Sequence, residues 1–375
     1  MSYNMTNVLG IVFANAHDET LPELTSNRAM GSVPFGGRFR LIDFALSSMV
    51  NSGISTVGII TKENYQSLLD HVGSGRQWDL ARSNGGLCIL PPYGMVNSGL
   101  YQGKLDALYN AVGYIRKTAC DYVVICDSNV IYNLDFSKLV DAHIDTGADI
   151  TCVVHTGEYT AEDTAVSAVY TADENGKVSE VSINCAKAGK MAMGLNVYVM
   201  AKDFLVDLVL DIIPKGKTSF GRDVLQGMLG ELDVRTYEFD GYFSKFSGLD
   251  SYYKESMALL DPDNLSKLVL PKRPVYTKVR DDAPSKYGLD SSVTNSLVAD
   301  GCVIDGVVEN SILFRGVKVA KGAVVKNCIL MQDTVVGKNT EISNIITDKQ
   351  VNVGEGIVVS SSEACPLYIA KNRKV

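Results

Sequence analysis

Short apolar runs alternate with amphipathic segments through the first 258 residues of the chain. The runs VLGIVFA, TVGIIT, DYVVICD and ADITCVVHT predict strands that are covered on both faces. The segments IDFALSSMVNSG and KLDALYNAVGYIRK place apolar residues at helical spacing, and Gly53 is suited to ending the first of these helices. This repetition predicts an α/β domain over residues 1–258, with a doubly wound, mostly parallel, Rossmann-like sheet.

The carboxyl ends of the predicted strands indicate where a ligand would bind, because ligands of such sheets lie there. That rule places the segments 14–21, 101–107 and 126–132 along one crevice. The first segment follows an apolar strand, where an α/β protein normally holds a phosphate, yet it contains no glycine. It carries the adjacent carboxylates Asp18 and Glu19 instead. The crevice is the expected functional site, but its first loop has the wrong charge for a phosphate.

A different pattern begins beyond residue 258. Prolines and charges cluster in residues 259–290, which predicts a linker. In residues 291–375 the helical period disappears, and apolar residues recur every six positions. The two columns are Val324, Leu330, Val336 and Ile342, and Leu313, Val319, Val325 and Met331; Gly316 and Gly322 keep the same spacing. A period of six predicts a parallel β-helix rather than a β-sandwich, and the open ends of such a stack predict an oligomer.

Composition narrows the class of protein. The net charge is −8 and basic residues do not cluster, which argues against nucleic acid as a partner. No apolar run approaches the roughly 18 residues that span a bilayer, and the N-terminus resembles a first strand more than a signal peptide. The eight cysteines form no C-x-x-C pair and there are four histidines, so a zinc site is disfavoured. Thiols within apolar strands indicate a reducing cytoplasm.

Five blocks of sequence resemble the glucose-1-phosphate adenylyltransferases, also called ADP-glucose pyrophosphorylases. They are ELTSNRAMGSVPFGGRFRLIDFALSSMVNSGI, LYQGKLDALYNAVGYI, SFGRDVL, GYFSKFSGLDSYYKESMALL and SLVADGCVIDGVVENSILFRGVKVAKGAVVKNCILMQDTVVG. The resemblance covers nearly the whole chain and implies a nucleotidyltransferase domain joined to a left-handed hexapeptide β-helix. It also implies a reaction, in which glucose 1-phosphate displaces pyrophosphate from ATP to give ADP-glucose, with Mg²⁺ bridging the phosphates.

The phosphate loop of that family is altered in this chain. The family's glycines align with Asn15, Ala16 and Asp18, and its arginine aligns with Thr20. Glycine is used there because a β-carbon obstructs the approach of backbone N–H groups to a phosphate. The altered loop is expected to reject a triphosphate. Alternatively, Asp18 and Glu19 only cap the N-terminus of a helix.

The family's lysine and metal ligands are altered as well. The lysine of its Arg-Ala-Lys-Pro stretch aligns with Met30, which is expected to pack. Its two metal-binding aspartates align with Asn129 and Lys245. Asp127 lies two residues before Asn129, about 6.5 Å further along an extended strand, which makes it a poor substitute. No firmly bound metal is expected.

These changes resemble the GlgD-type subunits of the family, which accompany a catalytic subunit and modulate it. The resemblance implies a cytoplasmic, catalytically deficient regulatory subunit in glycogen biosynthesis, held in a hetero-oligomer, expected to be a tetramer. One alternative is an active nucleotidyltransferase that binds Mg²⁺ through a rewired site at Asp18, Glu19 or Asp127. The other is a sensor of sugar phosphates or nucleotides that works without a catalytic partner.

Some polar positions of the family persist and could still bind a ligand. They are Tyr101, Gln102, Gly103 and Asp106 in the second segment of the crevice, and Gly194 and Asp223 on the sugar side. Within the second segment, Lys104 and Leu105 replace a threonine and an alanine of the family. Lys187 or Lys190 is the candidate for the lysine that contacts the sugar phosphate. The alternative is that these residues only hold the fold.

Three arginines flank a glycine-rich turn, GSVPFGG, near which the family binds phosphorylated effectors. They are Arg28, Arg38 and Arg40. Guanidinium groups around such a turn suit a phosphate. Ion pairing at the surface is the alternative.

Overall fold

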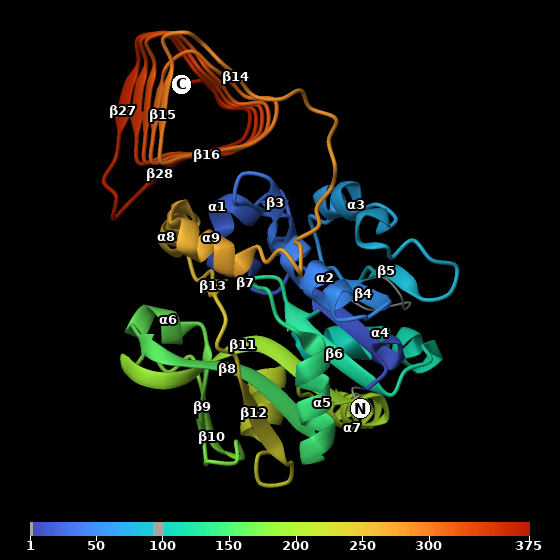
Figure 1. Cartoon of the computed structure of the whole chain (residues 1–375). Coiled ribbons are helices and arrows are strands. Elements are labelled where there is room, and N and C mark those ends of the chain that lie inside the picture. Colours follow the sequence, from blue (N-terminus) through green and yellow to red (C-terminus); the bar gives the residue numbers. More distant parts are fainter. Residues whose placement is uncertain (1–2, 93–100) are drawn as a thin grey trace.

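The computed structural model describes residues 3–92 and 101–375, in an α/β domain with a triangular β-helix at one end (Figure 1). Within these residues the main sheet has nine strands in the order β10-β9-β11-β6-β1-β4-β5, with β8 beside β11 and β12 beside β8. The strands are β1 (Val8–Phe13), β4 (Thr56–Ile60), β5 (Gly86–Leu90), β6 (Tyr122–Asp127), β8 (Ile150–Tyr159), β9 (Ala168–Ala172), β10 (Val178–Ile183), β11 (Gly189–Ala201) and β12 (Val234–Glu238).

The half of the sheet that carries the crevice is parallel. Strands β5, β4, β1 and β6 all run the same way, whereas β11 joins β6 in the antiparallel direction. Side chains of β1 point alternately to two cores, Leu9 and Ile11 to one and Val8 and Val12 to the other. The sheet is doubly wound, because α4 and α7 cover the first face while α2 and α5 cover the second.

The helices match the amphipathic segments closely. The helix predicted from KLDALYNAVGYIRK is α4 (Lys104–Lys117), and the one from IDFALSSMVNSG is α2 (Leu41–Asn51). The others are α1 (Pro22–Thr25), α3 (Gln66–Val72), α5 (Phe136–Thr146), α6 (Ala161–Ala165), α7 (Lys202–Ile212), α8 (Leu249–Met257) and α9 (Pro262–Leu268). In the described part of the chain, no helix has the length and apolar character that crossing a membrane requires.

Two small antiparallel pairs complete the N-terminal domain. They are β2 (Pro34–Phe35) with β3 (Phe39–Arg40), and β7 (Val130–Tyr132) with β13 (Phe243–Lys245). The second pair brings the segment after β6 beside Lys245, so two of the aligned metal-ligand positions become neighbours in space.

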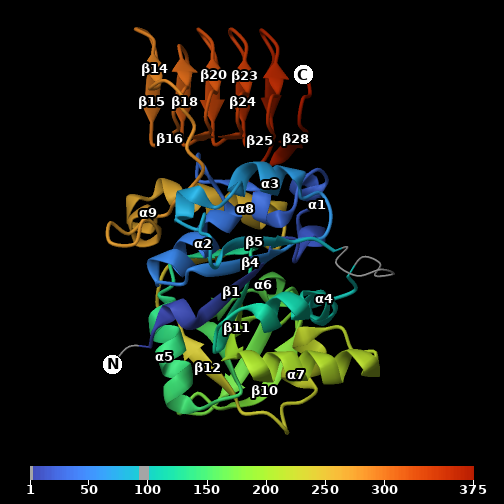
Figure 2. The ribbon, with the colours of Figure 1, turned by 90° about the vertical axis from the view of Figure 1, so that its right-hand side faces the viewer.

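The β-helix consists of three parallel stacks of five strands, and Figure 2 shows its successive rungs side by side. The first stack is β14 (Lys286–Tyr287), β17 (Val303–Ile304), β20 (Lys318–Val319), β23 (Val335–Val336) and β26 (Asn352–Val353). The second is β15 (Ser292–Thr294), β18 (Val307–Glu309), β21 (Val324–Lys326), β24 (Glu341–Ser343) and β27 (Val358–Ser360). The third is β16 (Leu297–Val298), β19 (Ile312–Leu313), β22 (Ile329–Leu330), β25 (Ile345–Thr347) and β28 (Leu367–Ile369). This is the expected left-handed β-helix.

The strict six-residue period differs from the observed register. Val324 pairs with Glu341, and equivalent positions of the middle rungs, such as Val307, Val324, Glu341 and Val358, are 17 residues apart rather than 18. On one side of such a rung the step between buried positions is five residues rather than six, as from Val325 to Leu330. At that step the buried positions pass from one predicted column to the other. The buried column is Leu313, Val319, Val325, Leu330, Val336 and Ile342. Val324 is half-buried, and Met331 packs against the N-terminal domain.

The segment expected as a linker, residues 259–290, contains structure at both ends. Helix α9 lies near its start, and β14 near its end already pairs with β17 of the β-helix. Residues 274–285 between them form no helix or strand.

The two domains share a buried interface. Phe35, Phe246 and Tyr252 of the first domain belong to the same apolar cluster as Phe314 and Met331 of the second. The Arg28 guanidinium also reaches the β-helix and donates to both carboxylate oxygens of Asp348, at 2.8 and 2.6 Å. Because this contact is both apolar and ionic, the position of the β-helix is tied to the segment that follows the phosphate loop.

Asparagine occupies a left-handed corner in four successive rungs: Asn295, Asn310, Asn327 and Asn344, with φ from 43° to 55°. A left-handed conformation costs a residue with a β-carbon about 1–2 kcal/mol, and asparagine less than most. Asn327 also donates to the side-chain oxygen of Asn344 at 3.2 Å. We expect Asn327→Ala to lower the free energy of unfolding by about 1–2 kcal/mol, and Asn327→Gly by less, because glycine accepts this conformation. Denaturant titration of both variants checks this, and equal losses would contradict it.

Candidate functional site

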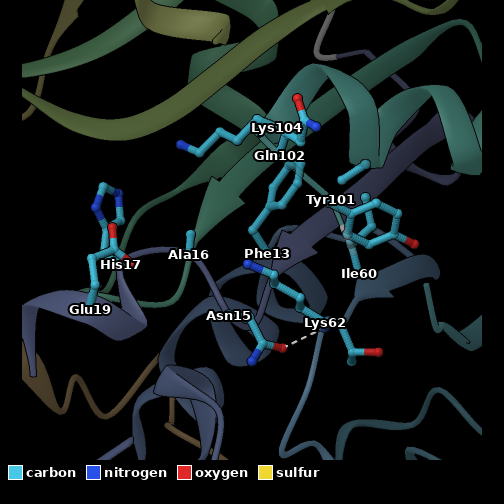
Figure 3. Close-up of a pocket in the computed structure, with 13 residues that line it drawn as sticks. Phe13, Asn15, Ala16, His17, Glu19, Ile60, Lys62, Tyr101, Gln102 and Lys104 are labelled. Atoms are coloured by element: carbon cyan, nitrogen blue, oxygen red, sulfur yellow. Dashed lines mark hydrogen bonds between the residues drawn. The ribbon is translucent and has the colours of Figure 1, made fainter. Parts of the chain in front are cut away.

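Two cavities meet in the crevice at the carboxyl ends of β1 and β6. Figure 3 shows the first, of about 230 Å³, and the second has about 330 Å³. His17, Gln102, Gly103 and Lys104 line both and stand between them. The first cavity continues over the loop after β1 and the end of β4, with Glu19 and Lys62 in its wall. The second continues over β11 and the turn at residues 218–222. The first cavity thus includes the altered phosphate loop, and the second lies beside the turn that precedes Asp223.

The loop after β1 is closed by its own side chains. Asn15 accepts from the Lys62 backbone N–H at 2.8 Å and donates to Asp18 Oδ2 at 2.7 Å. The other oxygen of Asp18 accepts from the Met30 backbone N–H at 2.8 Å. His17 between them has a left-handed backbone, with φ of 67°. A carboxylate of the chain thus takes N–H donors of the kind that a phosphate would need.

Burial, together with the charges of this loop, shifts the pKa of Asp18. Burial raises the pKa of Asp18 to about 6, with smaller contributions from the charges of Glu19 and Glu63, although the hydrogen bonds from Asn15 and Met30 lower it. At neutral pH the carboxylate is charged, close to where a polyphosphate would lie. Thr20, at the family's arginine position, donates to the His17 carbonyl at 2.8 Å. The Met30 side chain is fully buried in the interdomain cluster.

The end of β6 carries a buried carboxylate that is already paired. Asp127 has no exposed surface, and its Oδ2 lies 2.6 Å from Lys104 Nζ and 3.0 Å from His17 Nε2. Burial would raise the pKa of Asp127, but the charge of Lys104 and the hydrogen bonds from His17 and Lys104 hold it below its usual value. The carboxylate is therefore charged, and its charge is neutralised by the protein itself.

The two aligned metal-ligand positions lie beside this pair. Asn129 is buried, and its Oδ1 accepts from Asn196 Nδ2 at 3.3 Å. Lys245 donates to the Gly194 carbonyl at 3.0 Å. Burial lowers the pKa of Lys245 to about 7; the charge of Asp127 opposes this shift and the charge of Lys104 adds to it. Where the family has two aspartates, this chain has an amide and an amine.

These donors do not fit Mg²⁺, which prefers several carboxylate and water oxygens at near-octahedral geometry. Within residues 3–92 and 101–375, no group of three or more His, Cys, Asp or Glu side chains is placed to hold a metal ion. A rewired site at Asp18 or Asp127 has the same difficulty, and Glu19 would add only a single carboxylate. The oxygens of Asp18 are engaged by Met30 and Asn15, and Asp127 Oδ2 is engaged by Lys104 and His17.

The residual positions of the family divide into two groups. Tyr101, Gln102 and Gly103 line the first cavity. Asp106 and Asp223 bond to the backbone instead, Asp106 accepting from Gln102 N–H and Asp223 from Thr218 and Ser219 N–H. A β-carbon at Gly194 would lie 2.8 Å from the Tyr170 ring, so close packing requires this glycine. Lys187 and Lys190 are not in the wall of either cavity.

A third cavity, of about 450 Å³, lies between the first domain, residues 278–280 and the β-helix. Its wall is strongly basic and consists of Arg38, Arg40, Lys278, Arg280, Arg315, Lys349 and Lys371, with His71, Gln332, Asp333 and Gln350. Burial lowers the pKa of Lys349 to about 7, and the charges of Arg40 and Arg28 add to the shift. Concentrated positive charge in a concave site is suited to a phosphorylated anion.

The sequence pointed to part of this basic cavity. Arg38 and Arg40 line it, whereas Arg28 is buried and held by Asp348. The basic residues of the β-helix were missed because they lie far away in sequence. The rung period does contain a signal, since Arg315, Gln332 and Lys349 are 17 positions apart and so recur at one place in successive rungs.

The lowered pKa of Lys245 predicts a dependence of stability on pH. Because the pKa is about 7 in the fold and 10.5 ordinarily, the unfolded chain binds more protons between these values. The free energy of unfolding should therefore rise with pH across this window, by up to about 1.4 kcal/mol per pH unit from this group. Lys245→Met should remove that contribution, whereas Lys321→Met, at a lysine with a 75% exposed side chain, should not. Denaturation of the three proteins at pH 7, 8 and 9 checks this, and parallel pH curves would contradict it.

Comparisons with known proteins agree with the fold. Residues 10–261 match the family described as nucleotidyl transferase, and residues 281–364 match the family described as GlmU-like, C-terminal hexapeptide. The glycogen biosynthesis protein GlgD of Bacillus subtilis (strain 168) is 34% identical over 84% of this chain and 81% of its own length. For the glycogen biosynthesis protein GlgD of Geobacillus stearothermophilus, the values are 36%, 84% and 82%. For the glucose-1-phosphate adenylyltransferase of Geobacillus stearothermophilus, they are 34%, 84% and 82%. The chain therefore belongs to the nucleotidyl transferase family, in the group that includes the GlgD proteins and the glucose-1-phosphate adenylyltransferases.

Proposed function

We propose that this protein is a catalytically deficient, regulatory subunit of glucose-1-phosphate adenylyltransferase that acts in glycogen biosynthesis. It assembles with a catalytic subunit, in a hetero-oligomer expected to be a tetramer, and modulates the formation of ADP-glucose and pyrophosphate from ATP and glucose 1-phosphate. The protein acts in the cytoplasm, where its free cysteines would stay reduced. It needs no firmly bound metal.

The observation that carries the proposal is the reversal of charge along the crevice. The phosphate loop holds a carboxylate, Asp18, on the Met30 N–H, while a lysine, Lys245, stands where a metal-binding aspartate is expected. Transfer of a nucleotidyl group needs cations at the phosphates and carboxylates at the metal. This chain has a carboxylate where the phosphates need cations and a lysine where the metal needs a carboxylate, and both cavities are present in the crevice.

The proposal is tested by pyrophosphate release. The purified chain alone, with Mg²⁺ or with Mn²⁺, should give no turnover above background, and adding it to a catalytic subunit should change that subunit's saturation curves. The two chains should also co-elute in size-exclusion chromatography. Robust turnover by the chain alone would overturn the proposal. Normal kinetics without co-elution would favour a sensor that acts without this partner.

The basic cavity is the proposed site of a phosphorylated effector. Seven basic side chains in one concave wall support this, and the cavity lies against the interface that fixes the β-helix. A sugar bisphosphate should raise the melting temperature of the wild type, because a ligand that binds only the folded state stabilises it. Arg315→Gln should reduce that shift. An equal shift in the wild type and the variant would argue against this site.

A further inference from the structure

Lys104 is held in one position by the elements around it. It is the first residue of α4, and Gly103 before it packs so closely that a β-carbon there would lie 2.2 Å from the Thr218 carbonyl oxygen. Its ammonium nitrogen lies 5.8 Å from the centre of the Phe13 ring and 5.7 Å from that of Tyr198. Lys104 lines both cavities, and Figure 3 shows its side chain extending toward the side of the first cavity where His17 lies. The side chain is directed across the crevice rather than into solvent, with 22% of its surface exposed.

Its partner is the carboxylate that ends β6. Asp127 Oδ2 lies 2.6 Å from Lys104 Nζ, which donates to it, and 3.0 Å from His17 Nε2. These two contacts connect the phosphate loop, α4 and β6. Asp127 Oδ1 is buried as well, and no donor in the described ranges reaches it. A buried carboxylate with one unbonded oxygen depends on nearby positive charge for its stability. Lys104 supplies that charge, and Lys245 on β13 adds to it when it is protonated.

We infer that Lys104 is a permanent internal cation that takes, at Asp127, the place that a divalent metal ion would need. A metal bound to Asp127 Oδ2 would approach to about 2.1 Å, which the ammonium contact at 2.6 Å already prevents. Repulsion from Lys104 and Lys245 would act on any ion that approached the carboxylate from another side. The crevice is therefore charged without metal, and a divalent cation is excluded rather than merely bound less well.

The inference rests on the proposed function, in which the crevice no longer transfers nucleotidyl groups. The test of the inference measures metal binding rather than turnover, so the inference and the proposed function can fail separately. Mn²⁺ is the probe, and the amount of free Mn²⁺ is read from its electron paramagnetic resonance signal. The wild type should take up no stoichiometric Mn²⁺ at concentrations up to about 1 mM, a range in which sites with few carboxylates stay empty.

The informative variant is Lys104→Met/Lys245→Asp, which removes both ammonium groups and places a second carboxylate near Asp127. Methionine keeps the apolar stem against Phe13 and Tyr198. This variant should bind one Mn²⁺ at least about tenfold more tightly than the wild type, because two carboxylates now face the site. Lys245→Asp alone, which keeps Lys104, should bind no more tightly than the wild type. Lys104→Met/Lys245→Asn is the control for lost charge without a new ligand.

Three results would overturn the inference. The first is stoichiometric Mn²⁺ uptake by the wild type that Asp127→Asn abolishes. The second is uptake by Lys245→Asp alone that equals that of the double variant, because Lys104 would then exclude nothing. The third is no gain in a double variant whose circular dichroism spectrum and melting curve show that it is folded. If methionine prevents folding, Lys104→Thr/Lys245→Asp carries the same test with a small polar residue at position 104.

Discussion

Replacing Asp348 with alanine will destabilise the folded protein by about 3–5 kcal/mol, because the Arg28 guanidinium is then left buried without its partner. The side chains of Arg28 and Asp348 are 4% and 2% exposed, and the contact is bidentate. Asp348 also accepts from the Lys349 backbone N–H at 2.7 Å and from the Tyr368 hydroxyl at 3.1 Å. One substitution therefore leaves three donors without an acceptor at the interface of the two domains. The measurement is denaturant titration followed by circular dichroism.

The matched control is Glu309→Ala in the same β-helix. Glu309 pairs with Lys326 at 3.1 Å, but the two side chains are 40% and 49% exposed, and a pair of this kind contributes at most about 1 kcal/mol. The double variant Arg28→Met/Asp348→Leu should recover the part of the loss that comes from the unpaired guanidinium, although the Lys349 N–H and the Tyr368 hydroxyl still lack their acceptor. A loss in Asp348→Ala as small as that in Glu309→Ala would show that the pair contributes little to holding the domains together.

The fold was largely predictable because local pattern and tertiary environment agree in most elements. In α4, Leu105, Leu108, Val112 and Ile115 recur at helical spacing and all are buried against the sheet. The register of the β-helix was less predictable, since it depends on how many residues each corner takes. A rung of 17 residues keeps a six-residue period on two sides and loses it on the third, and apolar residues at both Val324 and Val325 left the sequence pattern ambiguous.

The candidate site was predictable where it depends on residue identity and not where it depends on pairing. The carboxylate at Asp18 and the amine at Lys245 followed from the sequence. The partner of Lys104 did not, because the approach of Lys104 to Asp127 requires α4 and β6 to be packed side by side. Arg28 was expected to bind a phosphate, but it pairs with Asp348. This pairing could not be predicted, because Asp348 lies 320 residues away in the sequence and becomes a neighbour only when the two domains pack together.

Restoring both aligned metal positions, by Asn129→Asp and Lys245→Asp, will leave the chain without appreciable turnover. The phosphate loop would still hold Asp18 on the N–H of Met30, and burial and the other carboxylates would still surround it. A carboxylate about 4 Å from a phosphate costs roughly 4 kcal/mol at an effective dielectric constant near 20, and this is about a thousandfold in rate. Lys104 would also still occupy Asp127. Pyrophosphate release with saturating Mg²⁺ measures the outcome.

Adding Asp18→Gly, Thr20→Arg and Lys104→Thr to those two changes should give the larger gain, on the order of a hundredfold or more over the two-residue variant. Glycine at position 18 removes the internal carboxylate, the new arginine supplies charge to the leaving pyrophosphate, and threonine at position 104 frees Asp127 from the ammonium. These three changes without the metal pair form the matched control and should bind ATP more tightly, as seen in thermal stabilisation, without turning it over. Strong activity from Asn129→Asp/Lys245→Asp alone would mean that the carboxylates of the phosphate loop matter less than the metal ligands. The loss of function would then lie at the end of β6 rather than in the loop after β1.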